Sequence, residues 1–80
     1  MGEKLPRIKP LQLIKALSKV GITVARQKGS HAQLTGFYKG ELKYTTIPVH
    51  SGEELPQGVL LAILKDLGIT RKELAEILKK

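Results

Sequence analysis

The sequence predicts an α+β fold in which a helix, a three-stranded antiparallel sheet and a second helix follow one another, with a short helix at the C-terminal end. Two patterns carry this prediction. Apolar residues recur at helical spacing near both ends of the chain, and between them apolar and polar residues alternate over three short segments. Because a three-stranded sheet needs a buried face to be stable, we expect the two main helices to cover one face.

The chain has 80 residues, which is room for one small domain over 1–80. Hydrophobic residues make up 41% of it, which is enough for a folded core and too much for a disordered tail. Aromatic residues are scarce and are limited to Phe37, Tyr38 and Tyr44. We therefore expect an aliphatic core built from Leu, Ile and Val.

Fourteen Lys and Arg residues stand against seven Asp and Glu residues, a formal net charge of +7. This charge on a small protein attracts polyanions, of which nucleic acid is the commonest in a cell, although an acidic protein partner is an alternative. The absence of cysteine excludes disulfides, thiolate nucleophiles and thiolate metal sites. With no apolar run long enough to span a membrane and no apolar signal segment, we expect a cytoplasmic protein without membrane contact.

The first element is an irregular arm over 1–9, in which charged residues alternate with Leu and Ile. The first helix is predicted to begin at Pro10, because the first helical turn does not need the N–H group that proline lacks. Its inward stripe consists of Leu13, Ile14, Leu17 and Val20. Gly21 is its expected left-handed end.

Alternation of apolar and polar residues with a period of two predicts three strands, over 22–27, 30–35 and 43–50. Lys28 and Gly29 are the expected turn of the first hairpin, and 36–41 form the longer tip of the second. Pro48 cannot donate a hydrogen bond to a neighbouring strand. The third strand is therefore an edge strand or ends near this residue.

A second helix is predicted over 58–67, with Gly68 as its end. Its inward residues are expected to be Leu60, Leu61, Leu64 and Leu67. Thr70 and Glu73 have the spacing of a capping box, in which each side chain accepts a hydrogen bond from the backbone of the other. This box begins a last short helix whose apolar residues are Leu74, Ile77 and Leu78.

The alternation also divides the side chains between the two faces of the sheet. The face expected under the helices carries Ile22, Val24, Ala32, Leu34, Ile47 and Val49. The opposite face carries His31, Gln33, Tyr44, Thr46 and His50. A second hairpin that turns within 36–41 sets His31 near Thr46, unless a β-bulge changes the register.

His31 is the main candidate for chemistry, because an imidazole with a free pKa of ~6.5 takes and gives protons near neutral pH. A ribonuclease that uses the RNA 2′-OH as nucleophile needs such a base and cations for the phosphate. Arg26 and Lys28 are close in sequence, and the turn at Gly29 and Ser30 offers N–H groups and a hydroxyl for a phosphate oxygen. The alternative is an ordinary hairpin turn followed by an exposed histidine.

His50 is the second candidate, as an acid or base that partners His31 or supports it. Its alternative role is that of a strand-end histidine that bonds loop backbone. Phe37 and Tyr38, expected at the hairpin tip, either stack on bases, dock into a partner or fold back on the sheet edge. Two histidines with Glu53 and Glu54 match no metal-ligand spacing, so we expect no metal and no cofactor.

Three blocks of residues resemble the HicA toxins, also called the YcfA family. The blocks are Gly21-Ile22 with 24–31 (Val-Ala-Arg-Gln-Lys-Gly-Ser-His), 47–52 (Ile-Pro-Val-His-Ser-Gly), and 58–60 with 63–70, which ends in a Gly-Ile-Thr corner. The run from Arg26 to His31 is the specific part, and the resemblance extends from residue 11 to about residue 78. Two departures are Ile22, where the family usually has an aromatic residue, and Ala32, where it often has His or another bulky residue.

The resemblance implies a fold like that of the double-stranded-RNA-binding domain. It also implies a metal-free, ribosome-independent endoribonuclease that cleaves mRNA and is held inactive by a HicB antitoxin. The catalytic histidine of the family corresponds to His31, and Gly29 and Ser30 correspond to its turn.

Two other functions remain open at this point. A non-catalytic RNA-binding module of the same fold normally has a lysine cluster where its last long helix begins, whereas this chain has Glu53 and Glu54 there, which repel phosphate. A degenerate toxin kept only as an interaction partner is the third hypothesis, and the intact Gly29-Ser30-His31 run argues against it.

Overall fold

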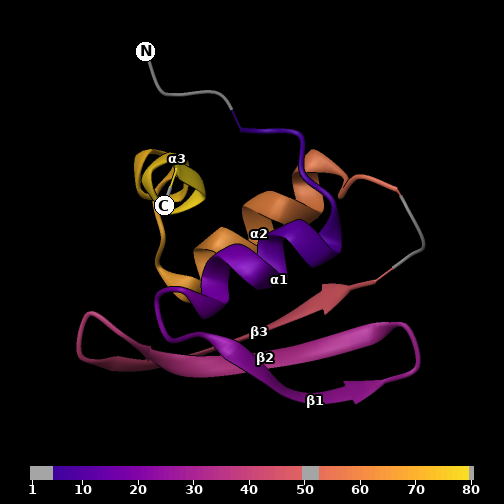
Figure 1. Ribbon diagram of the computed structural model, residues 1–80, viewed down its shortest axis with the longest axis horizontal. Helices are drawn as coiled ribbons and strands as arrows, with labels where there is room; N and C mark the ends of the chain where they lie inside the picture. Colours follow the sequence, from indigo (N-terminus) through magenta and orange to yellow (C-terminus); the bar gives the residue numbers. More distant parts are fainter. Residues whose placement is uncertain (1–4, 50–52, 80) are drawn as a thin grey trace.

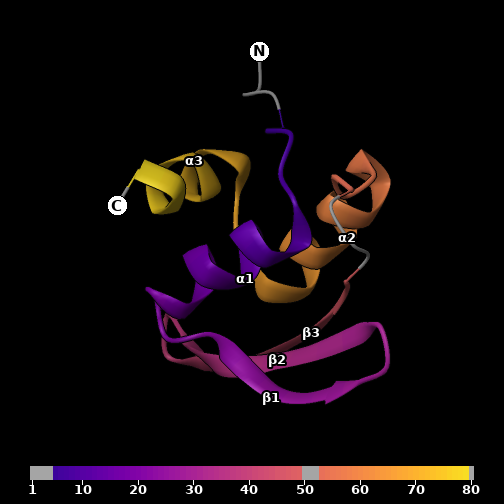
Figure 2. The ribbon, with the colours of Figure 1, turned by 45° about the vertical axis from the view of Figure 1, so that its right-hand side comes forward.

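The computed structural model describes residues 5–49 and 53–79. The elements are helix α1 (Pro10–Ser18), strands β1 (Thr23–Lys28), β2 (His31–Tyr38) and β3 (Glu41–Pro48), and helices α2 (Gln57–Leu67) and α3 (Arg71–Lys79). The strands form one antiparallel sheet in the order β1-β2-β3. Helices α1 and α2 lie on the same face of this sheet, and α3 lies against α1, farther from the strands (Figures 1 and 2).

This order confirms the predicted α+β fold, in which a helix, a three-stranded antiparallel sheet and a second helix follow one another. The arrangement is similar to that of a double-stranded-RNA-binding domain, and α3 is the predicted short helix at its end. Pro10 is the first residue of α1, as expected, and the preceding N–H of Lys9 donates to the side-chain oxygen of Gln12 (2.9 Å). Within the described parts of the chain, no helix has the length and hydropathy that crossing a membrane requires.

Gly36 lies where the α1–β1 connection crosses β2. A Cβ atom at Gly36 would overlap the carbonyl oxygen of Gly21 and lie 2.8 Å from the Cα of Ile22. The two backbone segments are therefore in direct contact, and only glycine fits at this point of β2. The contact allows Ile22 to enter the core, where it is fully buried.

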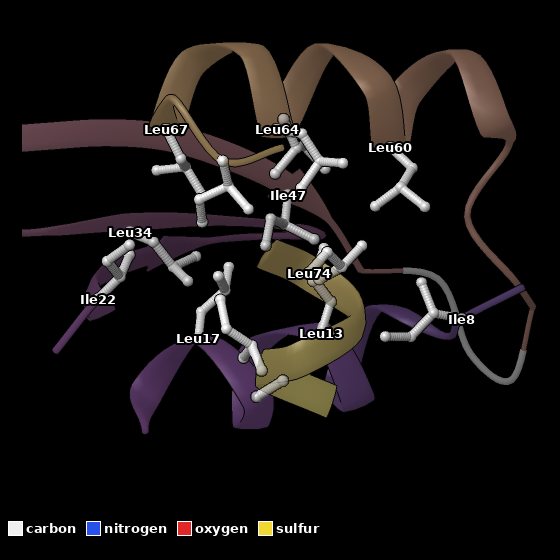
Figure 3. Packing of buried hydrophobic residues seen from close by; sticks show 14 of the residues in the cluster. Ile8, Leu13, Leu17, Ile22, Leu34, Ile47, Leu60, Leu64, Leu67 and Leu74 are labelled. Atoms are coloured by element: carbon white, nitrogen blue, oxygen red, sulfur yellow. The ribbon is translucent and has the colours of Figure 1, made fainter. Parts of the chain in front are cut away.

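The core between the sheet and the helices is aliphatic, as the composition predicted (Figure 3). One expectation for α2 is wrong: Leu61 is 44% exposed, and Ile63 is buried instead. The buried residues of α2 follow an i, i+3, i+4, i+7 pattern, which leaves Leu61 off the inward stripe. They are Leu60, Ile63, Leu64 and Leu67.

The second hairpin is longer than predicted. Its strands continue through 36–38 and resume at 41, so that the turn consists of Lys39 and Gly40 alone, with φ angles of 55° and 80°. Two positive φ angles are typical of the type I′ turn, whose twist matches that of paired strands. As a result His31 pairs with Pro48 and not with Thr46, a shift of two residues that leaves both on the predicted face.

Strand β1 is the edge of the sheet, and all six of its residues are exposed. Val24, predicted to point into the core, pairs with buried Leu34 but is 40% exposed. Strand β1 has a neighbouring strand on one side only, so an inward side chain at this edge is not enclosed.

Helix α3 is attached to the second hairpin through Glu73. The predicted capping box is present: the N–H of Glu73 donates to Thr70 Oγ1 (3.1 Å), and the N–H of Thr70 donates to Glu73 Oε1 (2.8 Å). Glu73 Oε2 accepts the hydroxyl of Tyr38 (3.2 Å) and forms an ion pair with Lys39. The hydrogen bonds from Lys39 and Thr70 lower the pKa of Glu73 to about 2. The pKa of Tyr38 is raised, mainly by burial and to a smaller extent by the negative charge of Glu73.

Helix α2 has a polar attachment to β3 that the sequence analysis missed. Thr45 is almost fully buried among the aliphatic residues, and its hydroxyl donates to Asp66 Oδ2 (3.0 Å). The bond satisfies a hydroxyl whose burial would otherwise be unfavourable.

We predict that Gly36→Ala lowers the free energy of unfolding by about 3 kcal/mol, because its methyl group would overlap the backbone of Gly21 and Ile22, which would have to shift. Gly58→Ala is the matched control, since a Cβ at Gly58 meets nothing within 4 Å and alanine favours the helix. Urea unfolding of both variants checks this, and equal stabilities would contradict the contact at Gly36.

A second prediction concerns acid. The pKa of Glu73 is about 2 in the folded chain and 4.5 ordinarily, so its carboxylate stabilises the fold above pH 4.5 and this contribution disappears as the pH falls toward 2. Glu73→Gln keeps a side-chain oxygen but has no charge to titrate. Urea unfolding at a series of pH values should show a steeper loss of stability for the wild type. Parallel curves for the two proteins would refute the role given to Glu73.

Candidate functional site

The first hairpin brings four of the predicted site residues together at one end of the sheet. Its turn is Gly29 and Ser30, one residue later than expected, so that Lys28 pairs directly with His31. Gly29 has a φ of 59°, which suits the first position of a two-residue hairpin turn, and a Cβ there would meet nothing within 4 Å. The N–H of Val49 donates to the carbonyl of Ser30 (2.6 Å), which attaches the turn to the end of β3.

A β-bulge in β1 determines which way the cationic side chains point. The pairing shifts between Val24 and Arg26, so that Ala25 is an extra residue without a partner in β2. Regular alternation from Val24 would direct Arg26 and Lys28 toward the helices. The extra residue reverses this, and the two cations lie on the face away from the helices, opposite Gln33 and His31.

His31 is exposed at the start of β2, on the face that the helices leave uncovered, and the next residue, Ala32, is fully buried on the other side. Its neighbours across the sheet are Lys28 on β1 and Pro48 on β3. Side chains that face each other in this way have Cβ atoms about 5 Å apart, so the ammonium of Lys28 reaches the surroundings of the imidazole.

The cationic side chains and the imidazole of this hairpin are available to a ligand. No ion pair or side-chain hydrogen bond joins Arg26, Lys28 or His31 to another residue in the described part of the chain. Gln33 and Thr46, half-buried and paired with each other, continue the same face toward the middle of the sheet. We call the exposed sheet surface that bears these residues the open face.

His50, the second candidate for acid–base chemistry, lies outside the residues that the structure describes. Over 5–49 and 53–79, no three His, Cys, Asp or Glu side chains gather in a way that could hold a metal ion. The positioned candidates are therefore Arg26, Lys28, Gly29, Ser30 and His31.

The far end of the open face is apolar, which the sequence analysis found only in part. Phe37, Leu42 and Tyr44 are 70%, 65% and 56% exposed, and Phe37 pairs with Leu42. Phe37 and Tyr38 were expected at a hairpin tip. They lie instead in β2, where they point to opposite faces of the sheet. Tyr38 is on the helix side with Glu73, and the two-residue turn at Lys39 and Gly40 is what moves both aromatic residues into the strand.

The open face thus offers a proton-transfer group beside two cations at one end and two aromatic rings at the other. An imidazole acts as general acid or base near neutral pH, and Arg and Lys stabilise charge on a phosphoryl group. Backbone N–H groups at a tight turn add further donors for an anion. These are the components that cleavage of a phosphodiester requires.

The chain matches one known protein family. Residues 12–69 match the model of the protein family described as the HicA toxin of bacterial toxin–antitoxin systems. The match covers more than half of the chain and includes the whole sheet, with the bulge and His31. Among the curated proteins, the chain has no match.

Proposed function

The chain belongs to the HicA toxin family of bacterial toxin–antitoxin systems, and from this membership we propose that it is an endoribonuclease that cleaves mRNA with His31 as its catalytic residue. The observation that carries the proposal is the first hairpin, where an exposed imidazole lies opposite Lys28 and on the same face as Arg26. This is the part of the molecule at which a phosphodiester would meet a base and two cations at once.

In the proposed reaction His31, as a neutral imidazole, removes the proton from a ribose 2′-OH. The oxygen attacks the adjacent phosphorus, the bond from phosphorus to the 5′-oxygen breaks, and the leaving oxygen takes a proton. The products are a 2′,3′-cyclic phosphate and a 5′-hydroxyl. In the reverse direction the same histidine serves as the acid, and His50 is the candidate from the sequence for the second proton transfer.

Charge stabilisation falls to the residues around the turn. Arg26 and Lys28 are proposed to neutralise the charge that builds up on the phosphoryl oxygens, and the N–H groups and hydroxyl of Gly29 and Ser30 to hold one of those oxygens. No step of this mechanism is assigned to a metal ion or cofactor, because the RNA supplies the nucleophile, His31 the base, and Arg26 and Lys28 the positive charge.

One observation favours the non-catalytic RNA-binding module as a second candidate. No described side chain donates to His31 or accepts from it, whereas a catalytic imidazole is commonly oriented by a third group. The same hairpin would bind phosphate without cutting RNA. The cleavage experiment below separates the two functions.

Membership of a toxin–antitoxin family implies a partner that silences the toxin. We propose that this partner is a HicB-type antitoxin, that it covers the open face around His31, and that both proteins act in the cytoplasm, where mRNA is translated. A complex that leaves His31 accessible to RNA would refute the second part of this proposal.

The decisive prediction is cleavage of an unstructured RNA by the purified protein in the presence of EDTA. We expect 5′-hydroxyl and cyclic-phosphate ends, and at least about a hundredfold slower cleavage by His31→Ala, since general acid–base groups typically contribute this much. Because His31 is exposed, the variant should fold like the wild type, which circular dichroism verifies. Binding without cleavage by the wild type would establish the binding module, and equal cutting by both proteins would remove His31 from the site.

A further prediction concerns salt. Arg26→Gln and Lys28→Gln should each weaken RNA binding and reduce the slope of log affinity against log salt concentration by about 1, because one phosphate contact is lost. Lys72→Gln is the matched control, since Lys72 is an exposed cation on α3, away from the sheet. Identical slopes for all three variants would mean that the hairpin cations do not contact phosphate.

A further inference from the structure

The apolar end of the open face has no covering in the structure. Phe37, Leu42 and Tyr44 form it, and each has more than half of its surface exposed, whereas the other side of the same sheet is packed with aliphatic residues. A contiguous exposed patch of large apolar side chains on a small protein marks an interaction site. The question is which class of ligand it suits.

The charges on the open face favour a polyanion as its ligand. Among the residues of the three strands, the single carboxylate is that of Glu41, and it pairs with Tyr38 on the helix side and binds Lys43. The open face therefore presents Arg26 and Lys28 with no acidic strand residue beside them. A ligand that carries both negative charge and flat apolar surfaces fits this combination, and a nucleic-acid strand has both.

The rings suit single-stranded RNA better than a duplex. Bases in a duplex are stacked on one another and are not accessible to side-chain rings, whereas the splayed bases of a single strand stack readily on Phe and Tyr. Tyr44 pairs with Thr35, four residues along β2 from His31, which is about 13 Å at about 3.3 Å per residue. That distance corresponds to at most about four nucleotides, because a splayed strand spans more than the about 3.4 Å per nucleotide of a stacked one.

We propose that the open face is a platform for single-stranded RNA, in which Tyr44 and Phe37 stack on bases a few nucleotides from the phosphodiester at His31. The placement relative to the cut rests on the proposed function, whereas the stacking itself requires only that RNA binds. Tyr38, which the sequence analysis considered together with Phe37, has no part in the platform, because its hydroxyl is bound to Glu73 on the helix side.

The test measures the binding of a short, unstructured, labelled RNA by fluorescence anisotropy. All variants carry His31→Ala in addition, so that the RNA is not cut. We expect Tyr44→Ala and Phe37→Ala each to weaken binding about tenfold, and the conservative variants Tyr44→Phe and Phe37→Tyr to retain it. Leu61→Ala is the matched control, because it removes a comparable exposed apolar side chain from α2. Circular dichroism verifies that every variant is folded.

A second measurement reports stacking directly. The chain has no Trp, so Tyr44→Trp introduces a unique indole whose fluorescence should be quenched when the single strand is added. The same RNA annealed to its complement should quench it far less. Equal quenching by the duplex would overturn the preference for single strands.

The remaining outcomes distinguish the platform from its alternatives. Unchanged affinity in Tyr44→Ala and Phe37→Ala would overturn the platform, whether or not the wild type cuts RNA. A loss of RNA affinity in Leu42→Ala as large as in the ring variants would overturn stacking by the rings. Self-association that these variants abolish in sedimentation velocity would identify a protein interface instead. Weaker binding in the ring variants of a protein that never cuts RNA would support the platform and refute only the proposed catalysis.

Discussion

The contact of Gly36 with the backbone of Gly21 and Ile22 constrains how the helical layer meets the sheet. The chain leaves α1 and reaches β1 by crossing directly over β2, with no side chain between the two backbones. Ile22 is thereby placed in the core, and the helices are held on one side of the strands. The opposite side stays uncovered, and the described residues to which we assign a function on RNA lie there or at the adjoining turn.

Within that frame, one extra residue decides the chemistry of the first hairpin. The bulge at Ala25 changes the phase of β1 between its apolar start and its cationic end. Val24 points to the helix side of the sheet, while Arg26 and Lys28 point to the open face, as His31 does. A regular strand of the same composition would separate the cations from the imidazole by the thickness of the sheet.

Local signals predicted most of the fold, and long-range ones were missed. Pro10, Gly68 and the capping box at Thr70 act within a few residues and were predicted correctly. The second hairpin turns within the predicted range 36–41, but its turn is shorter than predicted and consists of Lys39 and Gly40 alone. A lysine with positive φ has no local signature, and the ion pair of Lys39 with Glu73 joins residues far apart in sequence. Alternation predicted the face of the sheet on which His31 lies. It did not predict the bulge in β1, whose sign in the sequence is that Val24 and the cations Arg26 and Lys28 would share one face of a regular strand.

The edges of the sheet show another consequence of the bulge. Strand β1 has β2 on one side only, and an open strand edge is a template on which other chains can pair and aggregate. A bulge interrupts the regular ladder of such an edge, and charged side chains at its end repel an approaching copy. On the other edge, β3 ends at Pro48, which offers no N–H to a partner. The bulge and the cations that we propose for RNA binding thus also help, together with Pro48, to keep a sheet of three short strands from growing into a larger one.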